Sequence, residues 1–179
     1  MHECSTLPIN RIMANEHKQD GVCCLVSEVT EAPPTADCSE SGTASRKIQG
    51  RTIEHLLKPD RVDEIADTQY YYCADSDCPV VYFTGDDERS FTTEDLNVKV
   101  FAKDPGGDVN VCYCYDWTRD RIKNELAETG HSTALREIAE KVRAKLCECD
   151  IKNPKGTCCV GDVIQVVREA KEDLTAIKE

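Results

Sequence analysis

The chain has 179 residues, enough for one ordinary domain or two small ones, and only 6% of them are aromatic while 31% are charged. Its formal net charge of −12 argues against nucleic-acid binding, because contact with phosphates requires a cationic face. The N-terminal residues lack the apolar run of a signal peptide, and no segment approaches the roughly 20 apolar residues that cross a bilayer. We therefore expect a cytoplasmic protein that inserts into no membrane and binds no nucleic acid.

Twelve cysteines are the most unusual feature of the composition. A small domain with a modest apolar core needs either disulfides or bound metal. Without an export signal the compartment is expected to be reducing, and there clustered cysteines serve more often as metal ligands than in disulfides. We favour metal binding and keep a disulfide scaffold as the alternative.

Residues 1–37 are expected to be an N-terminal extension. Polar and charged residues dominate it, and the sequence Glu-Ala-Pro-Pro-Thr at 31–35 is typical of a linker. The extension holds Cys4, Cys23 and Cys24. These three are either ordinary thiols or ligands for a site in the following domain.

Residues 38–104 are expected to form a small β-rich domain. Short runs of β-branched and aromatic residues alternate with turn residues, and one short apolar run before Pro59 fits a helix. The expected elements are a turn at 38–42, strands at 47–53, 68–72, 80–83 and 97–101, and a helix at 52–58.

A Lys-Asp-Pro-Gly-Gly-Asp break at 103–108 marks the expected domain boundary, and residues 109–179 are expected to be helical. Apolar residues recur there at helical spacing, Thr118 fits an N-cap, and Gly130 fits a helix end. The expected helices span 118–128, 132–146 and 162–177. The fold class is thus α+β, with a β-rich subdomain followed by a three-helix domain.

Cysteines stand at both ends of this helical segment. Cys112 and Cys114 precede its first helix, and a second group follows thirty-odd residues later, made up of Cys147, Cys149, Cys158 and Cys159. Folding of the intervening helices would bring the two groups together. Soft thiolate ligands select iron–sulfur clusters or zinc, and helix N-termini stabilise thiolates. The pattern indicates an iron–sulfur site, with zinc or no metal as the alternative.

The Cys-x-Cys pair, the gap and the second cysteine group resemble the bacterioferritin-associated-ferredoxin-like [2Fe–2S] domain. The second group, with its Asn-Pro-Lys-Gly-Thr-Cys-Cys sequence, is also similar to the N-terminal part of CopZ-type copper chaperones over roughly residues 38–170. The resemblance implies a [2Fe–2S] cluster on Cys112, Cys114 and two of the four later cysteines. Spacing favours Cys147, and position next to a helix favours Cys159; Cys149 and Cys158 stay open.

Cys38 and the Cys73-x4-Cys78 pair suggest a tetrahedral zinc site in the β-rich half. The resemblance to the CopZ-type N-terminal domain, through Thr-Ile-Glu-His-Leu-Leu-Lys-Pro and the Val-Val-Tyr-Phe block, implies zinc held by paired cysteines. Here Ser41 replaces the second cysteine of the first turn, and a hydroxyl is a poor zinc ligand at neutral pH. The fourth ligand is then Cys23 or Cys24, an Asp or a His, or the site is lost.

Taken together, the resemblance implies an electron-transfer protein with a [2Fe–2S] cluster and Zn²⁺, acting with a redox partner protein. One-electron reduction in support of copper handling is a variant of this function, with Cu⁺ as a further candidate ligand. The 179 residues lack the Met-x-Cys-x-x-Cys loop of the copper-carrying module, which speaks against copper delivery by this polypeptide alone. The alternative is an accessory subunit of a larger oxidoreductase complex. We do not expect an enzyme acting alone, because no nucleotide loop or nucleophile elbow is visible.

Overall fold

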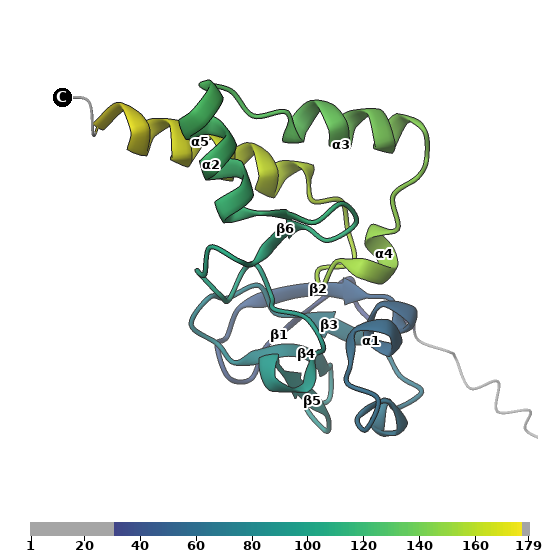
Figure 1. The fold of residues 1–179 in the computed structure, drawn as a ribbon. Coiled ribbons are helices and arrows are strands. Elements are labelled where there is room, and N and C mark those ends of the chain that lie inside the picture. The colour runs from purple at the N-terminus through teal and green to yellow at the C-terminus, as the bar shows by residue number, and fades with distance from the viewer. Residues whose placement is uncertain (1–30, 177–179) are drawn as a thin grey trace, which may run out of the picture. The chain divides into compact units, whose positions relative to one another are not determined.

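The computed structural model describes residues 31–176, and the residues from Ala32 onward form one compact unit. The first half is a five-stranded antiparallel sheet in which sequence neighbours pair in the order β1-β2-β3-β4-β5 (Figure 1). The strands are β1 (Thr35–Asp37), β2 (Ala44–Ile48), β3 (Tyr70–Tyr72), β4 (Val80–Thr84) and β5 (Ser90–Thr92). Helix α1 (Gly50–Leu56) and two short 3-10 helices (Val62–Glu64 and Thr93–Asp95) complete this half.

Strand β4 is buried on both faces, and the side chains of its neighbour β3 alternate between the two sides of the sheet. Tyr70 stacks on Phe91 in the core that also contains α1. Tyr71 stacks on Phe83 in a second core, which includes three cysteines. The period of two in the strands therefore separates an apolar core from a thiol-containing core.

The run at 97–101, which we predicted to be a strand, is irregular in the structure. It contacts the end of α1 instead: Asn97 donates its backbone N–H to Leu56 O at 2.8 Å, and its side-chain amide donates to His55 O at 3.1 Å. Val100 is buried against the apolar core. This β-like segment therefore does not extend the sheet. It donates hydrogen bonds to carbonyls at the end of α1, which would otherwise lack partners.

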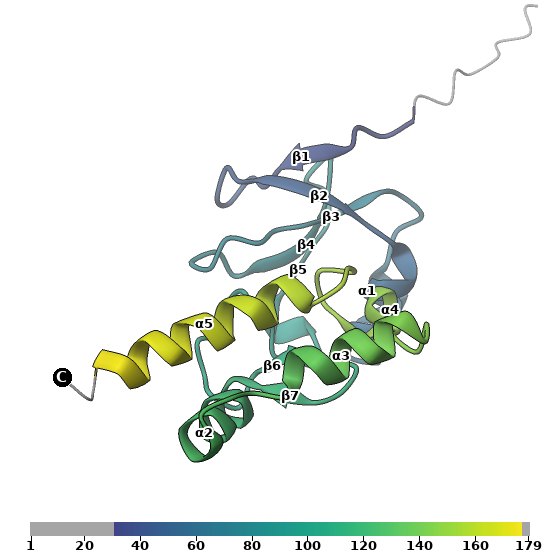
Figure 2. The same ribbon diagram turned by 90° about the horizontal axis from the view of Figure 1, so that it is seen from above.

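The second half begins with a two-stranded hairpin and continues with helices (Figures 1 and 2). Its elements are β6 (Asn110–Cys112), β7 (Trp117–Thr118), α2 (Arg119–Thr129), α3 (Ala134–Arg143), α4 (Cys149–Lys152) and α5 (Val160–Ala176). The Thr118 side chain caps α2 by accepting from Arg121 N, and Gly130 ends it with φ +78°, as predicted. The short α4 was not foreseen.

Helix α3 ends earlier than the predicted limit of 146. Its last residue is Arg143, and Lys145 adopts a left-handed backbone with φ +56°, which breaks the helical path. Leu146, the last residue of the predicted helix, therefore lies beyond α3 and is 58% exposed. The core of this half is formed instead by α2, the first part of α3 and α5, around Trp117, Ile122 and Ile138.

Two hydrogen bonds join the sheet half to the segment around α4, which lies beside α1 in both ribbon views (Figures 1 and 2). Thr52 Oγ1 donates to Asp150 O at 2.6 Å, and Tyr82 Oη donates to Pro154 O at 2.8 Å. Tyr82 is fully buried, so the Pro154 carbonyl depends on this hydroxyl for its partner.

Tyr82→Phe should therefore lower the free energy of unfolding by about 1–2 kcal/mol, because it leaves a buried carbonyl without a donor. Urea denaturation followed by far-UV circular dichroism measures the change. Tyr71→Phe is the matched control: its hydroxyl donates to Pro33 O in a partly exposed position, so a smaller loss is expected. Equal losses in the two variants would contradict the role assigned to Tyr82.

Among residues 31–176, no helix has both the length and the apolar character needed to cross a membrane.

Candidate metal centres

The first candidate centre lies where two sheet loops meet, the β1–β2 loop and the β3–β4 loop. Cys38 follows β1, Cys73 follows β3, and Cys78 precedes β4. Adjacent antiparallel strands place these loops at one end of the sheet, and the left-handed Gly42 closes the first turn through a 2.7 Å hydrogen bond to Cys38 O. The three Sγ atoms lie within 4.8 Å of one another and all three residues are buried. The sequence-predicted ligands in the described part of this half are thus brought together.

Ser41 lies beside this trio. Its Oγ is 3.5 Å from Cys73 Sγ and accepts a hydrogen bond from Thr43 N at 3.3 Å. The substituted residue therefore occupies the position where a fourth ligand would be expected. Cys23 and Cys24, the candidates from the extension, lie outside the described residues.

The surroundings of the three cysteines favour the thiolate form of Cys38 and disfavour that of Cys78. For Cys38, burial raises the pKa, but hydrogen bonds from the Ser41 backbone and hydroxyl outweigh it and bring the pKa below its ordinary value. For Cys78, burial and repulsion by the Cys73 sulfur raise the pKa. A cation placed among the three sulfurs would remove that repulsion, so the donor set is suited to a positive metal ion.

Lys103 supports the loop between the second and third cysteines and was missed by the sequence analysis. Its Nζ donates to Asp75 O at 2.7 Å and to Cys78 O at 2.9 Å. The Asp75 carboxylate in turn accepts from Thr43 Oγ1 at 3.0 Å, which ties this loop to the first turn. In the sequence, Lys103 is a single lysine at the start of a Pro-Gly break. A lysine in that position is typical of a linker, so nothing in the sequence indicated its role.

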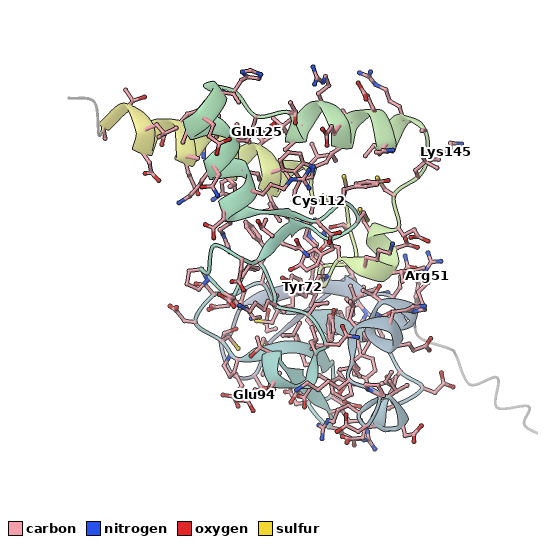
Figure 3. The ribbon with its side chains drawn as sticks, in the orientation of Figure 1. Arg51, Tyr72, Glu94, Cys112, Glu125 and Lys145 are labelled. Carbon is pink, nitrogen blue, oxygen red and sulfur yellow. The ribbon has the colours of Figure 1, made fainter. Side chains whose placement is uncertain are left out.

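The second candidate centre lies in the helical half. Cys112 ends β6, Cys114 lies in the β6–β7 turn, Cys149 begins α4, and Cys159 immediately precedes α5. Cys159 donates a thiol hydrogen bond to Cys112, and the Sγ atoms of Cys114 and Cys149 are 3.8 Å apart. Figure 3 labels Cys112 in this region. Segments 35 and 47 residues apart in sequence thus meet as two sulfur pairs.

The two remaining cysteines are placed differently. Cys147 Sγ is 3.9 Å from Tyr115 Oη, and Cys158 is exposed. Cys147, which was preferred on spacing, and Cys158 therefore lie outside the two pairs, which contain Cys149 and Cys159.

The Cys159 thiol and two backbone amides, rather than the helix that we expected after Cys114, stabilise the Cys112 thiolate. Strand β7 separates the pair from α2, so no helix N-terminus follows directly. The pKa of Cys112 is lowered to about 7, mainly by the hydrogen bond from Cys159 and then by the N–H groups of Cys114 and Tyr115. Burial and the same shared proton raise the pKa of Cys159. The two pKa values shift in opposite directions because one hydrogen bond joins the pair.

Cys114 and Cys149 form the more accessible pair. Burial raises the pKa of both thiols, and repulsion from the Cys114 sulfur contributes to raising that of Cys149 to about 12. The N–H of Glu148 donates to Cys114, so the backbone before α4 also faces this sulfur. Both residues are only partly buried, whereas Cys112 and Cys159 are 1% and 2% exposed. The centre therefore has a buried side and a side near solvent.

Comparison with known proteins agrees with the first centre. Residues 35–97 match the family zf_CopZ, described as a zinc binding domain. That region contains β1 to β5 and the three clustered cysteines Cys38, Cys73 and Cys78. The five strands of the sheet half thus lie within a match to a zinc-binding domain family.

The similarity continues beyond this domain. The chain is 27% identical over 122 residues to the copper chaperone CopZ of Archaeoglobus fulgidus, an alignment that covers 68% of this chain and 57% of that protein. The crystal structure of the N-terminal domain of Archaeoglobus fulgidus CopZ superposes with a TM-score of 0.60 at 23% identity, covering 72% of this chain and 95% of that one. The chain thus shares the fold of the CopZ N-terminal domain and spans just over half of the length of the CopZ relative.

Proposed function

We propose that the protein is an electron-transfer protein with a [2Fe–2S] cluster on Cys112, Cys114, Cys149 and Cys159, and with a structural zinc ion in the sheet half. The observation that supports the cluster best is the arrangement of four thiols as two close pairs. A [2Fe–2S] cluster takes two thiolates on each iron, whereas a zinc ion takes all four ligands around one point. In the described part of the chain, the cysteines of the helical half do not gather three sulfurs within 4.8 Å, as those of the sheet half do.

The neighbourhood of the four sulfurs also fits an inorganic, negatively charged group. The amides of Cys114, Tyr115 and Glu148 point at the sulfurs. Trp117 pairs with Cys112 across the hairpin, and its buried indole N–H has no hydrogen-bond partner among the described residues. Unpaired buried donors are costly, and a sulfur acceptor would satisfy this one.

For zinc, the three converging thiols supply three of four tetrahedral positions. Ser41, a water molecule or a residue of the extension would complete the set. The second core, which holds the three cysteines, contains few large apolar residues besides Tyr71 and Phe83, so a metal cross-link between its loops would add stability. We assign this ion a structural role in the module of residues 38–104, and the redox role to the module of residues 109–179.

When bound, the cluster would supply one-electron chemistry. The chain's contribution would be to exclude water from the Cys112 and Cys159 side and to leave the Cys114 and Cys149 side near solvent, where an electron can leave. The similarity to a copper chaperone makes reduction of copper to Cu⁺ a specific form of this function. A docking role as an accessory subunit of a larger oxidoreductase is the second candidate, because the cavities beside Tyr72, Leu96 and Tyr70 have no cysteine in their lining.

A redox titration tests the proposal. Anaerobically purified protein should accept one electron per chain from dithionite, reversibly, with the visible absorption bleaching and an EPR signal of a reduced [2Fe–2S] cluster appearing. A colourless protein that takes up no electrons would refute the redox function. Purification from the source cells at a fixed ratio with other redox subunits would favour the accessory-subunit alternative.

A further inference from the structure

Residues 141–146 form an exposed surface at the end of α3 and in the connection toward α4, and we call it the 141–146 patch. All six of its residues are exposed. Its charged members are Lys141, Arg143 and Lys145, and its large apolar members are Val142 and Leu146. Lys145 is labelled at the bend between the two helices in Figure 3.

The apolar side chains of the patch are unusually exposed. In the described chain the exposed large hydrophobic residues are Val142 at 41%, Leu146 at 58% and Ile164 at 50%. Two of these three lie within five positions of each other in the patch. Val142 lies in the last turn of α3 on its exposed side, and Leu146 lies beyond the end of that helix. Large apolar side chains grouped at a surface and rimmed by polar ones are typical of a binding site.

The charge of this region is opposite to that of the protein. Residues 141–155 contain five basic and two acidic residues, a net charge of +3, although the whole chain carries −12. Lys152 and Lys155 pair with Glu148 and Asp162. By contrast, Lys141, Arg143 and Lys145 make no ion pair within residues 31–176. The patch is therefore a local cationic surface whose charges are not neutralised by the rest of the described chain.

Direct contacts connect the patch to the cysteines of the helical half. The Tyr115 hydroxyl donates to Leu146 O at 2.7 Å and lies 3.9 Å from Cys147 Sγ. Lys141 Nζ is 5.8 Å from the centre of the same ring. Tyr115 follows Cys114 in sequence, and Cys149 lies three residues after Leu146. The patch therefore adjoins the Cys114 and Cys149 pair, which is the more accessible side of the centre.

We propose that the 141–146 patch binds an acidic face of a redox partner protein and places that partner next to the Cys114 and Cys149 side of the cluster. The inference rests on the proposed redox function. Basic side chains would steer an acidic partner, and Val142 and Leu146 would provide a small apolar contact at the centre of the complex. An extended polyanion, such as a membrane surface or a nucleic acid, fits less well, because the rest of the chain carries −15 and repels it.

Small oxidants of opposite charge test the surface without a known partner. The reduced protein is mixed with ferricyanide, a trianion, or with the cationic tris(phenanthroline)cobalt(III), and the loss of one electron per cluster is followed by stopped-flow absorption. Each oxidant gains the electron that one cluster loses. We expect the ferricyanide rate to fall as ionic strength rises, in spite of the negative net charge, because the oxidant meets a cationic surface at the electron exit.

Lys141→Glu/Arg143→Glu/Lys145→Glu should lower the ferricyanide rate at low ionic strength by at least about fivefold and reverse its salt dependence. The matched control is Arg46→Glu/Lys58→Glu/Arg168→Glu, which changes net charge equally at exposed positions elsewhere, and its rate should stay within about twofold. The corresponding Gln variants avoid placing acidic groups at the C-terminus of α3 and should show a smaller effect in the same direction. The visible spectrum of each variant confirms that the cluster is intact.

Equal effects of the two triple variants would overturn the proposal, since net charge alone would then govern the rate. A wild-type ferricyanide rate that rises with ionic strength would do the same. Binding to phosphatidylserine vesicles that is lost in the patch variant, without any patch effect on the ferricyanide rate, would assign the surface to membranes instead. Protein without a [2Fe–2S] chromophore would refute the proposed function itself, and the partner proposal with it, so the two failures are distinguishable.

Discussion

Cys149→Ser is expected to abolish the visible absorption of the anaerobically purified protein, and Cys112→Ser and Cys114→Ser are expected to do the same. The Sγ atoms of Cys114 and Cys149 are 3.8 Å apart, and Cys112 is hydrogen-bonded to Cys159. Loss of any of these four thiols leaves one iron with a single cysteine ligand, and a serine hydroxyl replaces a thiolate poorly at neutral pH. Absorption spectra and iron content per chain measure the effect.

Cys147→Ser is the matched control, because it removes a neighbouring thiol from the same connection without touching either pair. Cys147 Sγ contacts Tyr115 Oη at 3.9 Å, so the variant should keep its chromophore and its full iron content. Loss of colour in Cys147→Ser together with an unchanged spectrum in Cys149→Ser would show that the spacing-based choice of Cys147 was right and that the geometry misassigns the ligand.

Cys78→Ser is expected to release zinc and to unfold the sheet half, and to change the visible spectrum only through the contacts of Thr52 and Tyr82 with the segment around α4. Structural zinc sites contribute on the order of 10 kcal/mol at neutral pH, comparable with the whole stability of a small domain of about 5–15 kcal/mol. Removal of one of three clustered thiols therefore costs more than this half can lose. Zinc content by atomic emission and thermal unfolding by circular dichroism measure the two effects.

Ser41 provides a variant with the opposite effect. Because its Oγ lies 3.5 Å from Cys73 Sγ, Ser41→Cys should add a fourth thiolate and slow the loss of zinc to a chelator by at least about tenfold. Ser41→Ala keeps the three cysteines and should change zinc content little. If Ser41→Cys leaves zinc release unchanged, the fourth ligand lies elsewhere, and Cys23 and Cys24 become the residues to test.

Much of the fold could be predicted because local chemistry determines it. Thr118 and Gly130 mark the ends of α2, and the β-branched and aromatic runs around Tyr71 and Val81 form strands. The segment at 97–101 was wrongly predicted as a strand because pattern reasoning cannot tell that its backbone partners are carbonyls at the end of α1. The end of α3 was misplaced because nothing in the sequence predicts a left-handed Lys145.

The site residues divide in the same way. Cys38, Cys73 and Cys78 could be predicted as one ligand group because they lie beside predicted strands. The structure brings their three sulfurs together. The sequence could not show which of the four cysteines after α3 are ligands. Cys147 and Cys149 differ by only two positions, and the sequence does not predict that Cys149 begins the short helix α4. The role of Lys103, which holds the Cys73–Cys78 loop by two backbone carbonyls, depends on a contact about 25 residues away and leaves no local pattern.

The most direct test of the central claim is a count of iron, acid-labile sulfide and zinc per chain in protein purified without oxygen, combined with EPR of the dithionite-reduced sample. We expect two iron, two sulfide and one zinc, with the spectrum of a reduced [2Fe–2S] cluster. Zinc at both centres with no sulfide, or cystines joining Cys112 to Cys159 and Cys114 to Cys149 in native material, would contradict the assignment of these four thiols to a cluster.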